Sequence, residues 1–193
     1  MLARLLAVVL LILPTAVQAA AGEVRVALET SFGRIVVAVD TRRAPITANN
    51  FLRYVDSGKF NDTYFYRAAR SKTRPGVGLI QGGIDQNIRK SFMPIAHEPT
   101  NKTGIKHLDG TLSMARNKPG SAMGDFFITV GSGPSLDAGP GYVGYAAFGH
   151  VVSGMDIVRR ILTLKTYPGG FSVDTMGQMI VDRVTIRTAK RLP

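Results

Sequence analysis

Short segments that alternate apolar and polar residues recur along this chain, and turn-rich segments separate them. The alternation over 24–30 resumes over 34–39 after the turn Ser31-Phe32-Gly33, which predicts a hairpin. Further short strands are expected at 63–67, 79–82, 111–114, 126–130, 145–151 and 179–186. This pattern is typical of an antiparallel barrel or sandwich, so the predicted fold is mainly β, with the last strand pairing back into the sheet.

Two helices are expected among these strands. The first is predicted over 47–56 with Thr47 as its N-cap, and the second over 155–163. Each has one apolar face, formed by Phe51, Tyr54 and Val55 in the first helix and by Ile157, Val158, Ile161 and Leu162 in the second. No repeat or long linker divides the chain, which indicates a single domain.

The first residues have the features of an export signal. Arg4 supplies a positive charge, and residues 5–13 form an apolar run of about nine residues, whereas a bilayer span needs roughly 20. Pro14 ends the run, and Val17 and Ala19 place small residues at the −3 and −1 positions of a cleavage site. We expect residues 1–19 to be a signal peptide and residues 20–193 a soluble, exported domain. Cleavage after Ala21 and a retained anchor are alternatives.

Composition indicates how the domain is stabilised and which partners it could bind. The chain has no cysteine, so an exported domain of this size would rely on its core and not on disulfides. Its formal net charge is +11, which predicts either a solvated basic surface or attraction to acidic polypeptides or an anionic membrane face. Nucleic acid is not an expected partner, because surface aromatic residues do not interleave with the basic ones.

Three segments contain the candidate site: Phe65–Arg67, Ile80–Gly83 and Asp125–Ile128. Together they hold one arginine, one glutamine and one phenylalanine among apolar neighbours. Such a site can grip an apolar ring and direct hydrogen bonds at the amide beside it. This content favours a reaction in which no covalent bond breaks, such as rotation about a prolyl peptide bond.

Other chemistries find little support in the sequence. The three histidines, His97, His107 and His150, lack the spacing of metal ligands. Ser113 and Ser121 have neither an elbow motif nor an evident paired base. We therefore expect no metal and no cofactor.

Seven ordered motifs resemble the cyclophilins, a family of peptidyl-prolyl cis-trans isomerases, over about residues 24–193. They are Ala44-Pro45 with Asn50-Phe51, Phe65-Tyr66-Arg67, Gln81-Gly82-Gly83, Gly110–Ala115, Asp125–Ile128, Leu136-Asp137 and Phe148-Gly149. The resemblance implies a closed antiparallel β-barrel capped by two α-helices. It also implies a periplasmic location, because signal-bearing bacterial members of the family are periplasmic.

The resemblance also assigns roles by position. Arg67 matches the catalytic arginine, Gln81 the glutamine that holds it, and Phe127 a wall of the proline pocket. The expected substrate-binding positions are Leu79, Ala115, Arg116, Asp125, Leu136 and Tyr145.

The chain departs from the family pattern near this site. Tyr66 replaces a histidine, which we interpret as a packing change, and Asp125 replaces a glutamine. Gly78 stands where a pocket phenylalanine is expected, so that wall is either open or rebuilt by Val77. The loop between Arg67 and Gln81 is about six residues longer than usual, through the basic insert Ser71–Gly76, which contains Lys72 and Arg74.

The leading hypothesis is a monomeric prolyl isomerase that assists the folding of proline-containing exported polypeptides. The alternative is a weakly active or inactive proline-binding chaperone or interaction module on the same scaffold. Weak contact between the basic insert and an anionic membrane surface is a further expectation.

Overall fold

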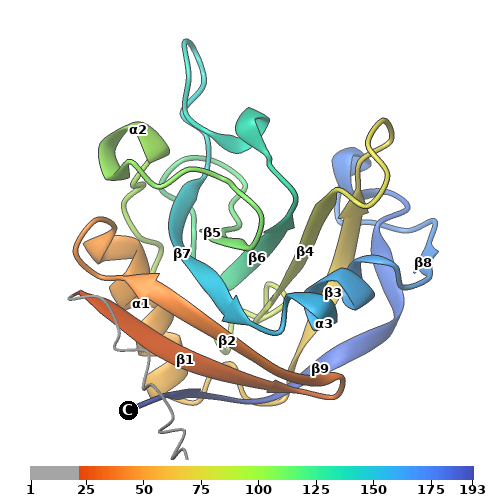
Figure 1. The fold of residues 1–193 in the computed structure, drawn as a ribbon, viewed down its shortest axis with the longest axis horizontal. Coiled ribbons are helices and arrows are strands. Elements are labelled where there is room, and N and C mark those ends of the chain that lie inside the picture. Colours follow the sequence, from red (N-terminus) through yellow and green to blue (C-terminus); the bar gives the residue numbers. More distant parts are fainter. Residues whose placement is uncertain (1–21) are drawn as a thin grey trace, which may run out of the picture.

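The computed structural model describes residues 22–193, and the expected signal peptide and its cleavage site lie outside the described residues. Nine strands form one antiparallel sheet (Figure 1). They are β1 (Glu23–Thr30), β2 (Gly33–Asp40), β3 (Thr63–Arg70), β4 (Gly78–Gly83), β5 (Thr111–Met114), β6 (Asp125–Val130), β7 (Ala146–Ser153), β8 (Thr166–Tyr167) and β9 (Met179–Arg191).

The sheet closes into a barrel. Its strand order is β1-β2-β7-β5-β6-β4-β3-β9, and β9 pairs with β1 to complete the circle, while the two-residue β8 adds to β9. Closure removes the free sheet edges that would otherwise expose unpaired backbone groups. The predicted closed antiparallel barrel is thus confirmed, and the last strand does pair back, continuing to Arg191 beyond the expected end.

Two longer helices, α1 (Pro45–Asp56) and α3 (Met155–Leu162), pack on the barrel, and a single turn, α2 (Thr100–Thr103), was not predicted. Both longer helices bury the apolar faces expected of them in one core, which includes Phe51 of α1 and Ile161 of α3. Short 3-10 turns occur at Pro134–Leu136 and Val173–Thr175. No helix within residues 22–193 is long and apolar enough to cross a membrane.

The start of α1 corrects one prediction. Thr47 is not the N-cap, because the helix begins at Pro45, whose missing N–H suits the first turn. The buried Glu98 carboxylate instead accepts hydrogen bonds from the backbone N–H of Ile46, at 3.2 Å, and of Thr47, at 2.6 Å. A side chain more than fifty residues away thus satisfies donors that local sequence would assign to a cap.

Candidate active site

A row of paired residues crosses four neighbouring strands at the candidate site. Arg67 of β3 pairs with Gln81 of β4, Gln81 with Phe127 of β6, and Phe127 with Ser113 of β5. Directly opposed residues in a sheet point to the same face, so these four side chains share one face of the barrel wall. The alternate residues, such as Ile80 and Phe126, point into the core. Strand register therefore brings together the three residues predicted to be catalytic.

A β-bulge at Tyr66 shapes this row. The register between β3 and β4 shifts between Phe65 and Arg67, so that Tyr66 and Arg67 together oppose Gln81. A bulge of this kind re-aims side chains and often occurs beside active sites. Here both side chains reach the same amide: Gln81 Oε1 accepts from Arg67 Nη1 at 2.7 Å, and Gln81 Nε2 donates to the Tyr66 hydroxyl at 2.8 Å. Tyr66 is thus more than the packing change expected from sequence.

The guanidinium of Arg67 is held from two sides. Its Nε donates to Gln178 Oε1 at 2.8 Å, and Gln178 is itself fixed because its Nε2 donates to the Asp174 carbonyl at 2.9 Å. An arginine has five N–H donors, and Arg67 uses one of them to Gln178 and one to Gln81. Within the part of the chain that the structure describes, the other three donors of Arg67 remain for a ligand. Burial lowers the pKa of Arg67, yet arginine stays charged at neutral pH.

Gln178 was not among the predicted site residues. It lies 111 residues from Arg67 in the chain, and no motif or spacing in the sequence connects the two. Only the pairing of β9 beside β3 brings it to the site.

Phe127 forms an apolar wall with rings on two sides. Its ring stacks on His107, with centroids 5.9 Å apart and planes inclined by 12°, and meets Tyr145 edge-on at 5.5 Å. Leu136 lies beside this group, because its carbonyl accepts from the Tyr145 N–H at 2.9 Å. Leu79 pairs with Ala69 and Thr129, two residues along β4 from Gln81 and on the same face. Phe127 and Leu79 thus share the strand face that holds Arg67, while Tyr145 adjoins Phe127 and Leu136 adjoins Tyr145. Contacts of these four residues with substrate stay predictions.

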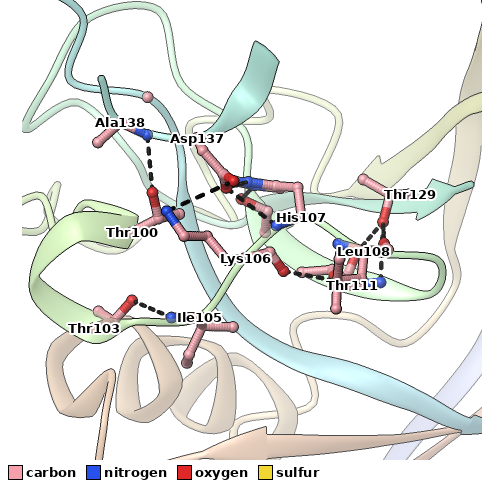
Figure 2. Close-up of polar contacts among 12 residues, drawn as sticks. Thr100, Thr103, Ile105, Lys106, His107, Leu108, Thr111, Thr129, Asp137 and Ala138 are labelled. Carbon is pink, nitrogen blue, oxygen red and sulfur yellow. Dashed lines mark hydrogen bonds and ion pairs between the residues drawn. The ribbon is translucent and has the colours of Figure 1, made fainter. Parts of the chain in front are cut away.

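His107 stacks on Phe127 and takes part in a polar chain, of which Figure 2 shows the contact with Asp137. Its Nδ1 bonds to Asp137 Oδ1 at 2.8 Å, and its Nε2 bonds to Ser113 Oγ at 2.9 Å. Because burial lowers the pKa of His107, the ring is neutral at pH 7, with Nδ1–H donating to Asp137 and Nε2 accepting from Ser113. Ser113 thus has a paired base after all. The order of groups matches a hydrolase triad, but Ser113 is fully buried and cannot meet a substrate as a nucleophile.

Ala115 and Arg116 follow β5 at the border of the site. The Ala115 N–H donates to the Asp125 carbonyl at 2.9 Å. Arg116 places its guanidinium over the Tyr145 ring, 4.7 Å from the centroid, and donates to the Gly144 carbonyl. Both residues are half-buried, and the Arg116 side chain holds Tyr145 in position.

Asp125 begins β6, two residues before Phe127 and on the same face of the strand, but its carboxylate is already engaged. Its carboxylate is buried and accepts from the Tyr66 hydroxyl at 3.1 Å, from the Asp85 N–H at 2.8 Å and from the Gln86 N–H at 3.1 Å. Three donors thus occupy the group expected to touch substrate. A direct substrate contact from Asp125 stays a prediction, and the geometry favours an indirect role through Tyr66.

The pocket wall at Gly78 is not formed by that residue. A Cβ at Gly78 would lie 2.2 Å from the Ala69 carbonyl oxygen, so the backbone leaves no room for a side chain. Val77 packs near Gly131, at the end of β6, and a role for it in the pocket stays a prediction. The end of β3, from which the next loop leaves, is tied down, because Arg70 donates to the carbonyls of Leu162 and Leu164.

Comparison with known proteins agrees with this fold. The chain matches the family model "Cyclophilin type peptidyl-prolyl cis-trans isomerase/CLD" over residues 25–190. It is 38% identical over 151 residues to peptidyl-prolyl cis-trans isomerase A of Dickeya dadantii, a match that covers 77% of this chain and 76% of that protein. It is 36% identical over 170 residues to isomerase B of Escherichia coli, covering 83% and 98%. The chain belongs to the cyclophilin family of peptidyl-prolyl cis-trans isomerases, and the activity predicted from its motifs is that of the family.

Solved structures show the same fold. The crystal structure of a cyclophilin-type isomerase of Cryptosporidium parvum, determined in the presence of the dipeptide Ala-Pro, superposes with a TM-score of 0.64 at 22% identity. The match covers 88% of this chain and 99% of that one. The prediction of a cyclophilin-like barrel is confirmed.

Proposed function

We propose that Arg67 is the catalytic group of this isomerase and that its substrates are X-Pro bonds in exported polypeptides. The observation that carries the proposal is a guanidinium held by Gln81 and Gln178 in the same row as the Phe127 ring. That row offers a fixed cation beside an apolar wall, which are the two elements needed to bind a prolyl amide. The Ala-Pro dipeptide in the Cryptosporidium structure supports a proline-containing ligand.

The physical basis is preferential binding of the twisted amide. Resonance gives rotation about a peptide bond a barrier of about 18–20 kcal/mol. Halfway through the rotation the prolyl nitrogen loses conjugation and becomes pyramidal, so its lone pair can accept a hydrogen bond. A guanidinium aimed at this nitrogen binds the twisted state better than either planar one, and such selective binding lowers the barrier.

The magnitude expected from Arg67 is substantial but partial. One preorganised donor in a desolvated site contributes about 3–4 kcal/mol, which corresponds to roughly 10²–10³ in rate. The apolar side chains of Phe127, Leu136 and Leu79 would hold the proline ring, and Gln81 would orient the cation. Exclusion of water around the amide would contribute the remainder.

Replacement of Arg67 tests this assignment. We expect Arg67→Ala to lower kcat/KM for a short X-Pro peptide at least tenfold, while the circular dichroism spectrum and the midpoint of thermal unfolding stay close to those of the wild type. Arg187→Ala is the matched control, because it removes an exposed arginine of β9 and should leave turnover unchanged. Wild-type turnover by Arg67→Ala would exclude Arg67 from catalysis.

A proline-binding module with little turnover is the second candidate. One observation favours a binding contribution: the loop over 171–176 exposes Phe171, Val173 and Met176, and the Phe171 ring meets the Tyr66 ring edge-on at 5.8 Å. Apolar side chains beside the site suit contact with unfolded chains. Measurement of both the affinity for an X-Pro peptide and the acceleration of its isomerisation distinguishes the two candidates, because a pure binder would show affinity without acceleration.

Export of the chain is part of the proposal. Its support is the sequence of residues 1–19. Expression of the full chain in a bacterial host, followed by fractionation and N-terminal sequencing, should yield a periplasmic protein that begins at Ala20. A product that begins at Gly22 would move the cleavage site, and a cytoplasmic product that keeps residues 1–19 would contradict export.

The basic insert is proposed to make weak contact with anionic membrane surfaces. Lys72 and Arg74 are exposed on it, although Arg74 also donates to the Ser132 carbonyl at 3.0 Å. Binding to vesicles of phosphatidylglycerol should weaken as salt rises, because exposed charges are screened. Vesicle binding that does not change with salt would contradict this contact. The expected monomeric state is a separate point, which sedimentation of the free protein tests.

A further inference from the structure

Four side chains form a continuous hydrogen-bond chain that ends at Arg67. Asp125 bonds to Tyr66 at 3.1 Å, Tyr66 to Gln81 at 2.8 Å, and Gln81 to Arg67 at 2.7 Å. The middle of the chain is fully enclosed, since Tyr66 has no exposed surface and Gln81 and Asp125 are buried. Tyr66 and Asp125 are both departures from the family pattern, and they meet each other in space.

The two ends of this chain fix the direction of every hydrogen bond in it. An ionised carboxylate can only accept, and a guanidinium can only donate. The single proton of the Tyr66 hydroxyl therefore points at Asp125, which leaves the phenol oxygen to accept from Gln81 Nε2. That places Gln81 Oε1 toward Arg67. The opposite orientation of the amide would set its NH₂ group against the donors of Arg67.

The far end of the chain is firmly anchored. Asp125 accepts from the backbone N–H groups of Asp85 and Gln86, so its carboxylate cannot rotate away from Tyr66 without losing them. Hydrogen bonds between buried groups reinforce one another in a low dielectric, and a partly satisfied network is costly. The arrangement is therefore suited to hold one orientation of the Gln81 amide.

We propose that Asp125 and Tyr66 are positioning residues for the reaction, which set the orientation of Gln81 and through it the aim of the Arg67 guanidinium. This role rests on the proposed catalytic function of Arg67. It gives the tyrosine and the aspartate a function in turnover without contact between either of them and the substrate.

The ionisation of Asp125 offers a readout of this role. Burial raises the pKa of Asp125 to about 6. The titratable and charged groups around it are Tyr66 of β3, Tyr54 of α1, and Asp85 after β4, which is paired with Arg183 of β9 at 2.7 Å. Once protonated, Asp125 can donate to the Tyr66 oxygen. The Tyr66 proton then turns toward Gln81 Nε2, which is itself a donor, so the hydrogen bond between Tyr66 and Gln81 is lost. Turnover should therefore fall as the pH drops through about 6.

The test uses Tyr66→Phe, Asp125→Asn and the double variant. Isomerisation of a short Ala-Pro peptide is followed by NMR exchange over pH 5–8, since a coupling protease would add its own pH dependence. Loss of one hydrogen bond in the chain should lower kcat about three- to tenfold. KM should stay within about twofold, because the proline ring is held by other side chains. Tyr66→Phe keeps the loop contacts of Asp125 and remains informative if Asp125→Asn folds poorly.

Tyr54→Phe is the matched control. It also removes a buried phenol hydroxyl, which accepts from the Phe92 N–H at 2.7 Å, but this hydroxyl lies outside the chain to Arg67. We expect this control to unfold at a lower temperature and to keep the wild-type kcat and pH profile.

Two results together support the positioning role: a double variant no slower than the slower single variant, and loss of the decline below pH 6 in both single variants. Wild-type kcat in Tyr66→Phe would overturn it, as would single effects that multiply in the double variant. A decline that persists in Asp125→Asn would assign the titration to another group, such as His107 beside Phe127, and would also overturn it. Turnover retained by Arg67→Ala would instead refute the proposed function itself.

Discussion

The buried carboxylate of Asp125 should make the stability of this protein depend on pH in a measurable way. Its pKa is raised from 3.8 to about 6, and desolvation is the largest cause. The folded state therefore binds this proton more tightly than the unfolded state. The contribution of Asp125 to the free energy of unfolding is complete below pH 3.8 and is lost as the pH rises through about 6. A change in pKa of this size corresponds to about 3 kcal/mol in the free energy of unfolding.

Asp125→Asn isolates this contribution, because the amide does not titrate. The measured quantity is the free energy of unfolding of the wild type minus that of the variant, from urea titrations followed by circular dichroism. From pH 4.5 to pH 7.5 this difference should fall by about 2 kcal/mol, the part of the total that lies within that range.

Other titrating groups cancel in this comparison. His107 acts in the opposite sense, because burial lowers its pKa and its stabilising effect is lost as the pH falls below 6.5. It is present in both proteins, so it changes the two curves equally. A difference that is the same at pH 4.5 and pH 7.5 would show that Asp125 does not titrate with a raised pKa, and the reasoning from its burial would fail.

Two further substitutions test the wall and the barrel. Phe127→Ala should weaken binding of an X-Pro peptide and lower the free energy of unfolding by about 3–5 kcal/mol, because it removes a buried ring between His107 and Tyr145. Calorimetry measures the affinity and urea unfolding the stability. An unchanged affinity would exclude Phe127 from the pocket. Gly82→Ala should lower the free energy of unfolding by about 1–3 kcal/mol, since a Cβ added at this position would lie 2.7 Å from the Phe65 ring. An unchanged midpoint of urea unfolding would show that the barrel wall can move to admit a methyl group.

Much of the barrel could be predicted because its signals are local. Alternation with a period of two identified eight of the nine strands, and the predicted bounds of β5 agree with the structure. The two-residue β8 carries too little pattern to be seen. The start of α1 was misplaced because the groups that satisfy its first turn come from Glu98, which no local rule connects to Thr47.

The candidate site was predictable only in part, for a related reason. Arg67, Gln81 and Phe127 lie in recognisable motifs, and strand register then places them in one row. Gln178 and the partnership of His107 with Ser113 depend on side-chain contacts across the folded barrel, which sequence spacing does not encode. A bulge of one residue at Tyr66 likewise leaves no mark in the sequence, yet it decides which side chains reach Gln81.

The two departures from the family pattern at Tyr66 and Asp125 are best understood as one unit. They lie 59 residues apart in the chain, so from sequence each appears to be a separate substitution. A buried phenol needs an acceptor for its proton, and a buried carboxylate needs donors, so each residue satisfies the requirement of the other. An uncharged amide at position 125 could still accept that proton but could not keep acceptors facing both the Tyr66 side and the Gln86 N–H. The aspartate is therefore the side chain that can serve the tyrosine and the loop at the same time, at the cost of a buried charge at neutral pH.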